Sequence, residues 1–358
     1  MSSKATIEEI ALLANVSTAT VSRTFSNPEK VCESTRKRVE EICMQYDFSP
    51  RLYRKKQQLI DREPLVAIIV ADLKNIFFYE IISSIKKVLN EHGINLAIFD
   101  SQESAAYELQ NLNFLENIQA NGIFITPISE TSPVNSDILK SFSKKGVPVI
   151  LVDRDVKGIN LDGVFQNNYS GAYESVSKLV ENGHQHIATI AGPISSNPGI
   201  DRLNGYLDAL KDHQLPVRQE YILYGNNMQD SGYQLTRQLL SRYSDVTAIF
   251  AANNLMAVGS LRAIREFGMK IPDDIAFIST GALQSFDLYG DVAITELSNQ
   301  TDAMGEECAK LMIERLSGSR KSRQKIPAKR ITFEMTLNSK GSEVYPLNRK
   351  ITAKADSY

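Results

Sequence analysis

The sequence has few cysteines and no long apolar run. Its three cysteines, Cys32, Cys43 and Cys308, include no C-x-x-C pair, so neither a disulfide framework nor a zinc site is predicted. The first residues read MSSKATIEEIALLAN, with acids where a signal peptide would be apolar. No later run approaches the ~18 apolar residues of a membrane span. We therefore expect a cytoplasmic protein with no membrane partner.

The motifs of common enzymes are also missing. The sequence has no G-x-G-x-x-G after its first strand-like run, no G-K-[ST], no G-x-S-x-G and no H-E-x-x-H. Its four histidines, His92, His184, His186 and His213, show no metal-ligand spacing, and we expect them at the surface or at helix caps. The main rival hypothesis is an enzyme on a doubly wound sheet. Such an enzyme needs a nucleophile or a phosphate-binding loop, and the sequence shows the motif of neither. We predict no enzymatic activity, no cofactor and no metal.

What is present is a chain of 358 residues, 42% of them hydrophobic, which is enough for two or three domains with real cores. Charge is unevenly distributed. Residues 1–62 hold 11 Lys and Arg against 8 Asp and Glu, and the rest hold 29 against 34. A basic N-terminal end is weak evidence by itself for a phosphate-backbone partner, because many solvated helical surfaces show as much.

Two short helical patterns lie between Thr6 and Phe25. Thr6, with Glu9 three residues later, predicts the first N-cap, and Ser17 predicts the second. The apolar positions that keep helical spacing are Ile7, Ile10, Ala11, Ala14, Val16 and Val21. A third amphipathic segment, Glu33 to Tyr46, places Val39, Ile42, Cys43 and Tyr46 on one face. This arrangement predicts a three-helix domain that contains a helix-turn-helix.

In such a motif the second helix enters the major groove of DNA. Thr18, Ala19 and Arg23 would then face base edges, since Ala19 can touch a thymine methyl and Arg23 can bond bidentately to guanine. The candidate DNA contacts are Thr6, Ser17, Thr18, Ala19, Thr20, Ser22, Arg23, Asn27, Arg51, Arg54 and Lys55. A plain αα-hairpin with Ser and Thr caps is the alternative, but the spacing, the basic third segment and the terminal location favour DNA binding.

The segment TIEEIALLANVSTATVSRTFSNPEKVCESTRKRVEEICMQYDFSP, about 45 residues long, resembles the N-terminal domain of the LacI/GalR family of transcription regulators. The resemblance implies that Thr18, Ala19 and Arg23 read the bases. Family members continue with a hinge whose leucine wedges into the minor groove. Here Arg51, Arg54 and Gln57 replace the usual asparagine, alanine and leucine. Either Leu59 is a shifted wedge or the basic hinge is held by phosphates, with less kinking.

From Leu65 the chain alternates apolar runs with amphipathic stretches. The runs are LVAIIVAD, NLAIFD, GIFITPIS and VPVILVD, and the pattern restarts near Gly163 with GVFQNN, HIATIAGP, YILYGNN, TAIFAANN and IAFISTG. Continuous apolar strands in βαβα order predict parallel sheets covered on both faces. No 20–50-residue sequence repeat is evident. The predicted fold class is an all-α helix-turn-helix domain followed by a two-lobed α/β core.

Ligands of parallel sheets bind beyond the carboxyl ends of the strands. A polyol-type pocket needs amides, carboxylates, an arginine and aromatic faces, and the residues there supply most of that set. The candidate effector contacts are Asp72, Asn75, Phe77, Phe78, Ser101, Thr126, Asp153, Arg202, Asn227, Asn253, Gly281 and Asn299, with Asn167 as a further strand-end residue. Strand-end Asp and Asn are equally common as helix caps, so each residue has two possible roles.

The body is also similar to the family's effector-binding core, which is like periplasmic sugar-binding proteins. The matching motifs are ADLKNIFF, PVILVDR, NNYSGAYE, AGP with R-x-x-G, and AANNLMAVG. They imply that Asp153, Arg202 and Asn253 contact the effector. The sequence departs from the pattern where Gly281, Asn254 and Asn167 replace aspartates and Thr336 replaces an arginine. A periplasmic protein would need a signal peptide and would have no N-terminal DNA-binding domain.

The expected domains are a helix-turn-helix at 1–48, a hinge at 49–63, a core at 64–341 and a flexible tail at 342–358. The N-lobe would span about 64–163 plus 298–325, and the C-lobe about 164–297 plus 326–341. The resemblance implies a homodimer on double-stranded operator DNA, with contact along Tyr79 to Leu89 and no leucine heptads for a tetramer. We expect a repressor of carbohydrate-utilisation genes with a sugar-like effector. Corepression or activation by a nucleoside or sugar phosphate stays open.

Overall fold

The computed structural model of the protein describes residues 6–46, 48, 64–283, 293–318 and 326–345. The chain divides into two compact units, Met1–Glu63 and Pro64–Tyr358. The hinge contacts predicted at Arg51, Arg54 and Lys55, and the departure at Gln57, lie outside the described residues.

The first unit is a small helical domain. Its elements are α1 (Ile7–Leu13), α2 (Thr18–Ser26), the 3-10 helix η1 (Pro28–Lys30) and α3 (Glu33–Gln45). Thr6 forms the predicted capping box with Glu9, and the Ser17 hydroxyl accepts from the Thr20 amide at 3.1 Å. Ile10, Val21 and Val39 are almost fully buried between the three helices. The predicted helix-turn-helix region is confirmed.

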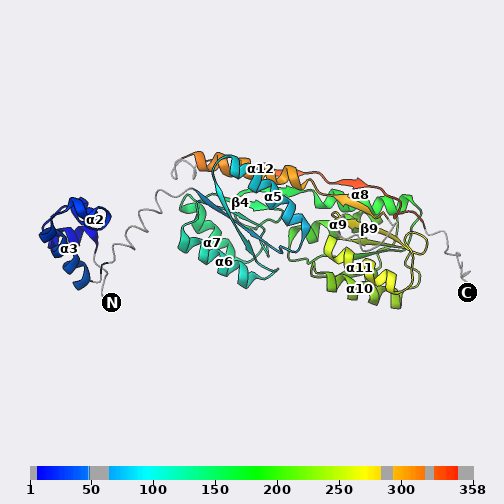
Figure 1. The fold of residues 1–358 in the computed structure, drawn as a ribbon. Coiled ribbons are helices and arrows are strands. Elements are labelled where there is room, and N and C mark those ends of the chain that lie inside the picture. Colours follow the sequence, from blue (N-terminus) through cyan, green and yellow to red (C-terminus); the bar gives the residue numbers. More distant parts are fainter. Residues whose placement is uncertain (1–5, 47, 49–63, 284–292, 319–325, 346–358) are drawn as a thin grey trace, which may run out of the picture. The chain divides into compact units, whose positions relative to one another are not determined.

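The second unit holds two six-stranded sheets, one in each lobe, seen side by side in Figure 1. The first sheet has the order β11-β5-β4-β3-β1-β2, and all its strands run parallel. Its strands are β1 (Leu65–Val70), β2 (Asn95–Asp100), β3 (Gly122–Ile125), β4 (Val149–Val152), β5 (Asp162–Gln166) and β11 (Arg330–Phe333). Its helices are α5 (Ile76–Glu91), α6 (Ala105–Ile118), α7 (Pro133–Lys144) and α12 (Thr301–Ser317).

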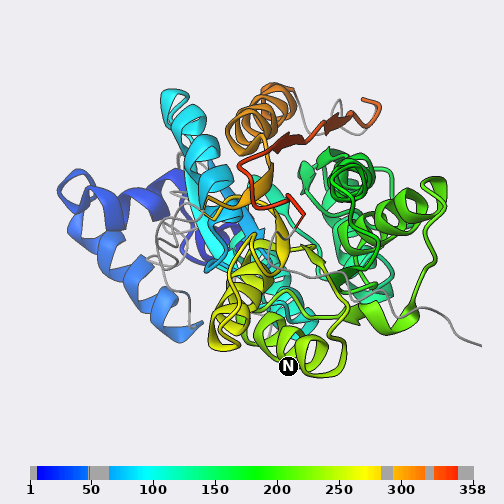
Figure 2. The same cartoon turned by 90° about the vertical axis from the view of Figure 1, so that its right-hand side faces the viewer.

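The second sheet has the order β12-β10-β9-β8-β6-β7, and only β12 runs antiparallel to its neighbour. Its strands are β6 (Ile187–Ala191), β7 (Ile222–Tyr224), β8 (Ala248–Ala251), β9 (Ala276–Thr280), β10 (Thr295–Ser298) and β12 (Thr336–Asn338). Its helices are α8 (Asn168–Glu181), α9 (Asn197–Asp212), α10 (Gln229–Arg242) and α11 (Asn254–Glu266), with the 3-10 helix η2 (Gln219–Tyr221) before β7. Figure 2 separates the α8–α9 pair from the α10–α11 pair.

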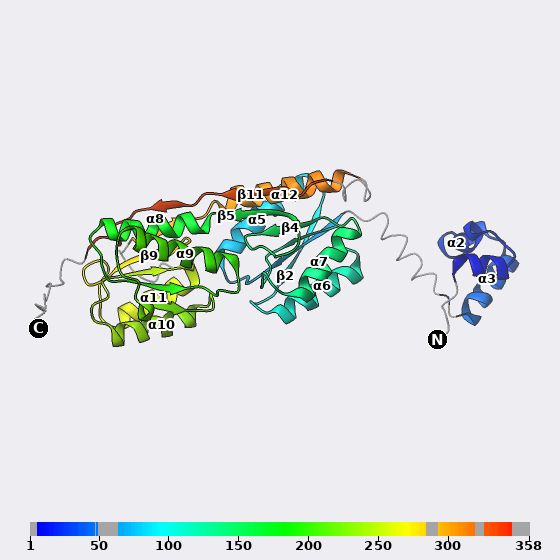
Figure 3. The ribbon, with the colours of Figure 1, turned by 180° about the vertical axis from the view of Figure 1, so that it is seen from behind.

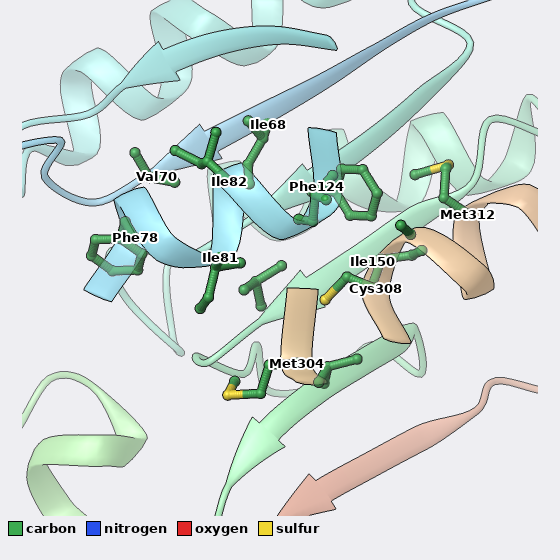
Figure 4. Packing of buried hydrophobic residues seen from close by; sticks show 14 of the residues in the cluster. Ile68, Val70, Phe78, Ile81, Ile82, Phe124, Ile150, Met304, Cys308 and Met312 are labelled. Carbon is green, nitrogen blue, oxygen red and sulfur yellow. The ribbon is translucent and has the colours of Figure 1, made fainter. Parts of the chain in front are cut away.

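Each sheet is apolar on both faces because its strands alternate between two cores. Ile68 and Val70 of β1 point to α5 and α12, whereas Ala67 and Ile69 point to α6 and α7. Figure 4 shows the first of these cores, where α5 and α12 side chains meet those of the sheet. Double coverage explains why these strands read as unbroken apolar runs in the sequence. All nine predicted strands are present.

Two strands lie in a different lobe from the one predicted. The run GVFQNN was assigned to the C-lobe, but β5 pairs with β4 in the first sheet, and the chain crosses to the second lobe only after it, at Asn167. Likewise β11 pairs with β5 in the first sheet, as Figure 3 shows, whereas 326–341 was assigned to the C-lobe. A buried apolar strand has the same pattern in either sheet, so its pairing partners, and not its sequence, decide the lobe.

The C-terminal segment and one histidine also differ from prediction. Ser342 and Glu343, predicted to begin a flexible tail, are 1% and 4% exposed. The Ser342 backbone carbonyl accepts from the Phe277 amide, and the Thr295 hydroxyl donates to the Glu343 carboxylate. His184, predicted at the surface or a cap, is fully buried and bonds the Thr247 hydroxyl at 3.0 Å and the Glu343 carbonyl at 3.2 Å. This histidine therefore connects the C-terminal segment at Glu343 to the second lobe at Thr247.

In the part of the chain that the structure describes, no helix is both long enough and apolar enough to cross a membrane.

Candidate functional site

A cavity lies between the two lobes of the second unit, at the carboxyl ends of their strands. It is lined by Asn75, Phe77, Phe78, Asp153, Arg154, Gly192, Ser196, Pro198, Gly199, Arg202, Asn227, Asn253, Asn254, Thr280 and Asn299. Asp153 directly follows β4, Asn253 is the second residue after β8, Thr280 ends β9 and Asn299 directly follows β10. Parallel strands bring their carboxyl ends to one edge, which is where such sheets bind ligands.

Eight of the twelve predicted effector contacts line this cavity. They are Asn75, Phe77, Phe78, Asp153, Arg202, Asn227, Asn253 and Asn299. The other four, Asp72, Ser101, Thr126 and Gly281, are not among its lining residues. Ser101 and Thr126 are fully buried, and Asp72 accepts from the Lys74 amide at 2.9 Å within its own loop. Asn167 caps α8 and donates to the Glu334 carboxylate at 3.0 Å.

Several lining residues were missed from the sequence. Arg154 directly follows Asp153, so the strand-end rule could have included it, but its carboxylate partner Glu103 could not have been foreseen. Arg154 is bidentate to Glu103, with nitrogen–oxygen distances of 2.8 and 2.6 Å. Gly199, at the start of α9, passes so close to the Pro193 carbonyl that a Cβ would lie 2.0 Å from it. Only tertiary structure shows such an approach.

Asp153 is the most constrained side chain of the site. Its φ of 65° lies in the left-handed region, which is uncommon outside glycine. It is 6% exposed, and its Oδ1 has no hydrogen-bond partner. Burial raises the pKa of Asp153, although Arg202 and Arg154 lower it. A strained, buried carboxylate with an unused oxygen is typical of a ligand-binding position.

Arg202 provides the opposite charge. Its Nε donates to the Asn168 Oδ1 at 2.9 Å and its Nη1 to the Ala252 carbonyl at 2.7 Å. Neither partner is a carboxylate, so these contacts orient the guanidinium without neutralising it. Burial lowers the pKa of Arg202, while Asp153 raises it. Arginine keeps its charge in proteins, and the cavity therefore holds an oriented cation beside a carboxylate.

Neutral polar atoms and aromatic faces complete the lining. Thr280 Oγ1 and Asn299 Oδ1 are buried and have no hydrogen-bond partner. Leaving such atoms unpaired costs free energy, so a hydroxyl-rich ligand that donates to them would be stabilised. Phe77 and Phe78 meet edge to face with ring centroids 5.1 Å apart. Aromatic faces suit the C–H surfaces of a ring, and the set as a whole suits a compact polar ligand.

The first unit presents a second candidate surface, on α2. Thr18, Ala19 and Arg23 are exposed together on this helix. Thr20 and Ser22 are half-buried, whereas Thr6, Ser17 and Asn27 are exposed. The Thr20 hydroxyl bonds the Ser17 hydroxyl at 2.9 Å at the helix start, where amide groups can also bind phosphate. The geometry fits a helix that offers a small apolar contact and one arginine to a DNA groove.

Two family models cover most of the chain. Residues 63–337 match the model of periplasmic binding proteins and the sugar-binding domain of the LacI family. Residues 6–51 match the model of bacterial regulatory proteins of the lacI family. The two matches follow the division of the structure into a helical unit and a two-lobed core.

Individual relatives agree with the family models. The HTH-type transcriptional repressor PurR of Klebsiella pneumoniae (strain 342) is 27% identical over 323 residues, covering 90% of this chain and 93% of that protein. The structure of the transcriptional regulator CelR in complex with cellobiose is 26% identical, with a TM-score of 0.69 over 94% of this chain and 99% of that one. The lac repressor dimer bound to operator and the anti-inducer ONPF is 22% identical, with a TM-score of 0.68 over 96% and 100% of the two chains, which is a likeness of fold.

Proposed function

This chain belongs to the LacI family of bacterial regulatory proteins, and from that premise we propose that it represses carbohydrate-utilisation genes under the control of a sugar-like effector. It is a DNA-binding transcription regulator with a small-molecule effector and not an enzyme. The proposal includes three further points: the identity of the effector, the contacts of α2 with operator bases, and the dimeric state. Its relatives are bacterial transcription repressors.

The choice of a sugar-like effector rests on three oxygen atoms without hydrogen-bond partners, which belong to residues that line the cavity. Asp153 Oδ1, Thr280 Oγ1 and Asn299 Oδ1 are buried and unpaired. A ligand with several hydroxyl groups can donate to all three, and its hydroxyl oxygens can accept from Arg202. The CelR structure holds cellobiose, which supports the same class of ligand for this cavity.

A nucleoside or sugar phosphate that acts as corepressor or activator is the second candidate. The observation in its favour is Arg202, whose hydrogen-bond partners are an amide oxygen and a carbonyl. A guanidinium without a carboxylate bonded to it can hold a phosphate or carboxylate bidentately. Asp153 opposes an anion at the same place, because its carboxylate lies near enough to perturb the arginine. The neutral polyol therefore remains the better fit.

The proposed assembly is a homodimer that places two copies of α2 on one operator. The family premise supports it, as does Tyr79 of α5, which is 62% exposed on the helix where we expect contact. Two-fold symmetry would match a pseudo-palindromic site and would double the small set of base contacts that one α2 offers. Sedimentation of the purified protein at several concentrations tests this part of the proposal.

The effector proposal is tested by a thermal-shift screen of sugars, sugar phosphates and nucleosides. We expect a sugar to raise the melting temperature. In Asp153→Asn, at least a tenfold higher sugar concentration should be needed for the same rise, because the amide has one acceptor fewer. Asp137→Asn, the same change on an exposed acid of α7, is the matched control. If the only stabilising compounds were phosphates whose effect required Arg202 but not Asp153, the second candidate would replace the first.

The DNA-binding role is tested by selecting operator sequences from a random pool and then measuring binding of variants. Arg23→Ala should lose about tenfold or more against the selected sequence and relax the preference at one base pair. Lys37→Ala, at an exposed position of α3, should instead weaken all sequences alike. Unchanged selectivity in Arg23→Ala would remove the assigned base contact.

A further inference from the structure

Hydrogen bonds join the two lobes directly at the cavity. Asn254 Nδ2 donates to Asn75 Oδ1 at 2.8 Å, and the Asp155 amide donates to Asn197 Oδ1 at 2.8 Å. Longer contacts run from Asn227 Nδ2 to Glu103 Oε1, at 3.4 Å, and from the Glu130 amide to the Ser195 carbonyl, at 3.4 Å. Of these pairs, Asn254 and Asn75 are the one in which both side chains line the cavity and both are buried, at 4% and 8% exposure.

The oxygen of Asn75 has two functions at once. Asn75 is the N-cap of α5 in the first lobe, and its Oδ1 accepts from the Phe77 amide at 3.1 Å. The same Oδ1 accepts from Asn254, the first residue of α11 in the second lobe. Asn254 is itself oriented, because its Oδ1 accepts from the Leu255 amide at 2.9 Å, which leaves its Nδ2 as the donor to Asn75. One amide pair thus ties the starts of two helices in different lobes.

Through α12, the helix α5 is connected to another residue that lines the cavity, Asn299. α5 packs along α12, where the Ser84 hydroxyl donates to Asp302 at 2.7 Å and the Thr301 hydroxyl donates to Glu80 at 2.8 Å. α12 begins two residues after Asn299, which lines the cavity. A shift at the start of α5 would therefore move α12 as well. Both helices pack on the first sheet.

We propose that the Asn254–Asn75 hydrogen bond is an interlobe latch, which sets the balance between closed and open lobes and with it the position of α5. Because both residues line the cavity, an effector bound there can strengthen or release this bond directly. The inference rests on the proposed function, because it assigns to that site the contact through which occupancy reaches α5. Asn254 and Asn75 act as positioning residues, and no other change of the fold is required.

We expect the two residues of the latch to respond differently to the same change from asparagine to aspartate. Asn254→Asp removes the donor and sets a carboxylate against the Asn75 oxygen. Asn75→Asp keeps the acceptor for both Phe77 and Asn254 and adds a negative charge at a helix N-terminus, which is favourable. We expect Asn254→Asp to lower the closed-to-open ratio about fivefold to tenfold, the worth of one hydrogen bond, and Asn75→Asp to leave it unchanged or raise it.

The measurement is the distance between the lobes in the full-length protein. Spin labels at Asp137→Cys in α7 and Gln238→Cys in α10 report it, in a background where the exposed Cys32 is serine; Cys43 and Cys308 are buried. Asn226→Asp is the control, since the side-chain oxygen of this exposed residue accepts from the Met228 amide in its own lobe. Hydrogen exchange of the segment 75–78 provides a second readout that is sensitive to small open populations.

Longer distances or faster exchange in Asn254→Asp, with Asn75→Asp and Asn226→Asp like the parent protein, would support the latch. Equal behaviour of Asn254→Asp and Asn75→Asp, in either direction, would overturn it, as would an Asn254→Ala variant whose distances and exchange match the parent. Circular dichroism melting establishes that each variant folds. These measurements use neither effector nor operator, so a failed latch can be told apart from a failed ligand screen.

Discussion

The two lobes of the core share one strand order, but they hold their helices in place differently. In each sheet four central strands run parallel. One edge strand follows the first strand of its lobe in the sequence (β2 or β7), and the other comes from the C-terminal end of the chain (β11 or β12). The first lobe fastens its edge with charged groups buried between chain segments. In the second lobe the helix pairs α8–α9 and α10–α11 approach backbone to backbone at glycines, more closely than α5 and α12 of the first lobe do at Gly305. The same topology is therefore compatible with two kinds of packing, which the strand pattern does not distinguish.

In the first lobe the principal buried pair is Arg315 of α12 with Asp162 of β5. Arg315 bonds both oxygens of the carboxylate, at 2.7 and 2.6 Å, and the two side chains are only 5% and 9% exposed. Arg315 also donates to the Pro327 carbonyl, and Asp162 also accepts from the Lys329 amide. This network connects α12, β5 and the segment that leads into β11.

In the second lobe α10 and α11 cross at a pair of glycines. A Cβ on Gly259 would lie 2.0 Å from the Gln229 carbonyl oxygen, and one on Gly232 would lie 2.1 Å from the Met256 carbonyl oxygen. Each glycine therefore faces the backbone of the other helix. Side chains larger than hydrogen cannot be accommodated there unless the helices separate.

The largest effect is expected from breaking the buried pair of the first lobe. Arg315→Leu leaves Asp162 charged and buried without its partner, which should lower the free energy of unfolding by about 3–5 kcal/mol. Urea denaturation followed by circular dichroism measures the loss. Arg262→Leu, which removes a half-exposed pair with Glu266 on α11, is the control and should change little. A loss in Arg315→Leu no larger than the control's would show that the first lobe does not depend on this pair.

A smaller effect is expected from the glycine crossing of the second lobe. Gly259→Ala should lower the free energy of unfolding by about 2 kcal/mol, because the cost of separating α10 and α11 exceeds the ~1 kcal/mol that alanine gains in helix propensity. Denaturation of the variant beside Ser241→Ala, at an exposed position of α10, measures it. A stabilised Gly259→Ala protein would mean that the helices can move apart freely, and the contrast between the lobes would be lost.

Much of the fold could be predicted because it depends on local sequence patterns. Thr6 with Glu9 and Ser17 carry their capping signals in sequence, and both caps are formed as expected. The apolar runs identified nine of the strands for the same reason, since most of these strands, such as β3, β4 and β8, are buried along their whole length. The edge strand β2 is more exposed. Six of the eight predicted cavity residues came from one rule, that residues after parallel strands gather at one edge, whereas Arg202 came from the family resemblance.

What could not be predicted depends on contacts between distant segments. β5 reads like any buried strand, and only its pairing with β4 and β11 places it in the first lobe. Glu343 looked like part of a polar tail, but the Thr295 hydroxyl and the Gly341 amide hold its carboxylate. In the cavity, the bond from Asn254 to Asn75 spans 179 positions. No periodicity in the sequence encodes such partners.

The smallest effect is expected from pH, and it again concerns a buried ionisable group in the first lobe. Glu108 of α6 is fully buried, accepts from the Ile128 amide at 2.8 Å and also bonds Asn135 of α7. Burial raises the pKa of Glu108 to about 7. The folded protein therefore holds a proton that the unfolded chain releases, so stability falls as pH rises from near 4.5 and levels off above 7.

Between pH 6 and pH 8 this carboxyl should lower the free energy of unfolding by about 1 kcal/mol. Glu108→Gln cannot ionise, so its stability should show less of this slope, whereas Glu91→Gln, at the exposed end of α5, should keep it. Urea denaturation of the three proteins at several pH values provides the slopes. Parallel slopes in all three would mean that Glu108 stays ionised in the folded lobe, where its two hydrogen-bond donors would then outweigh its burial.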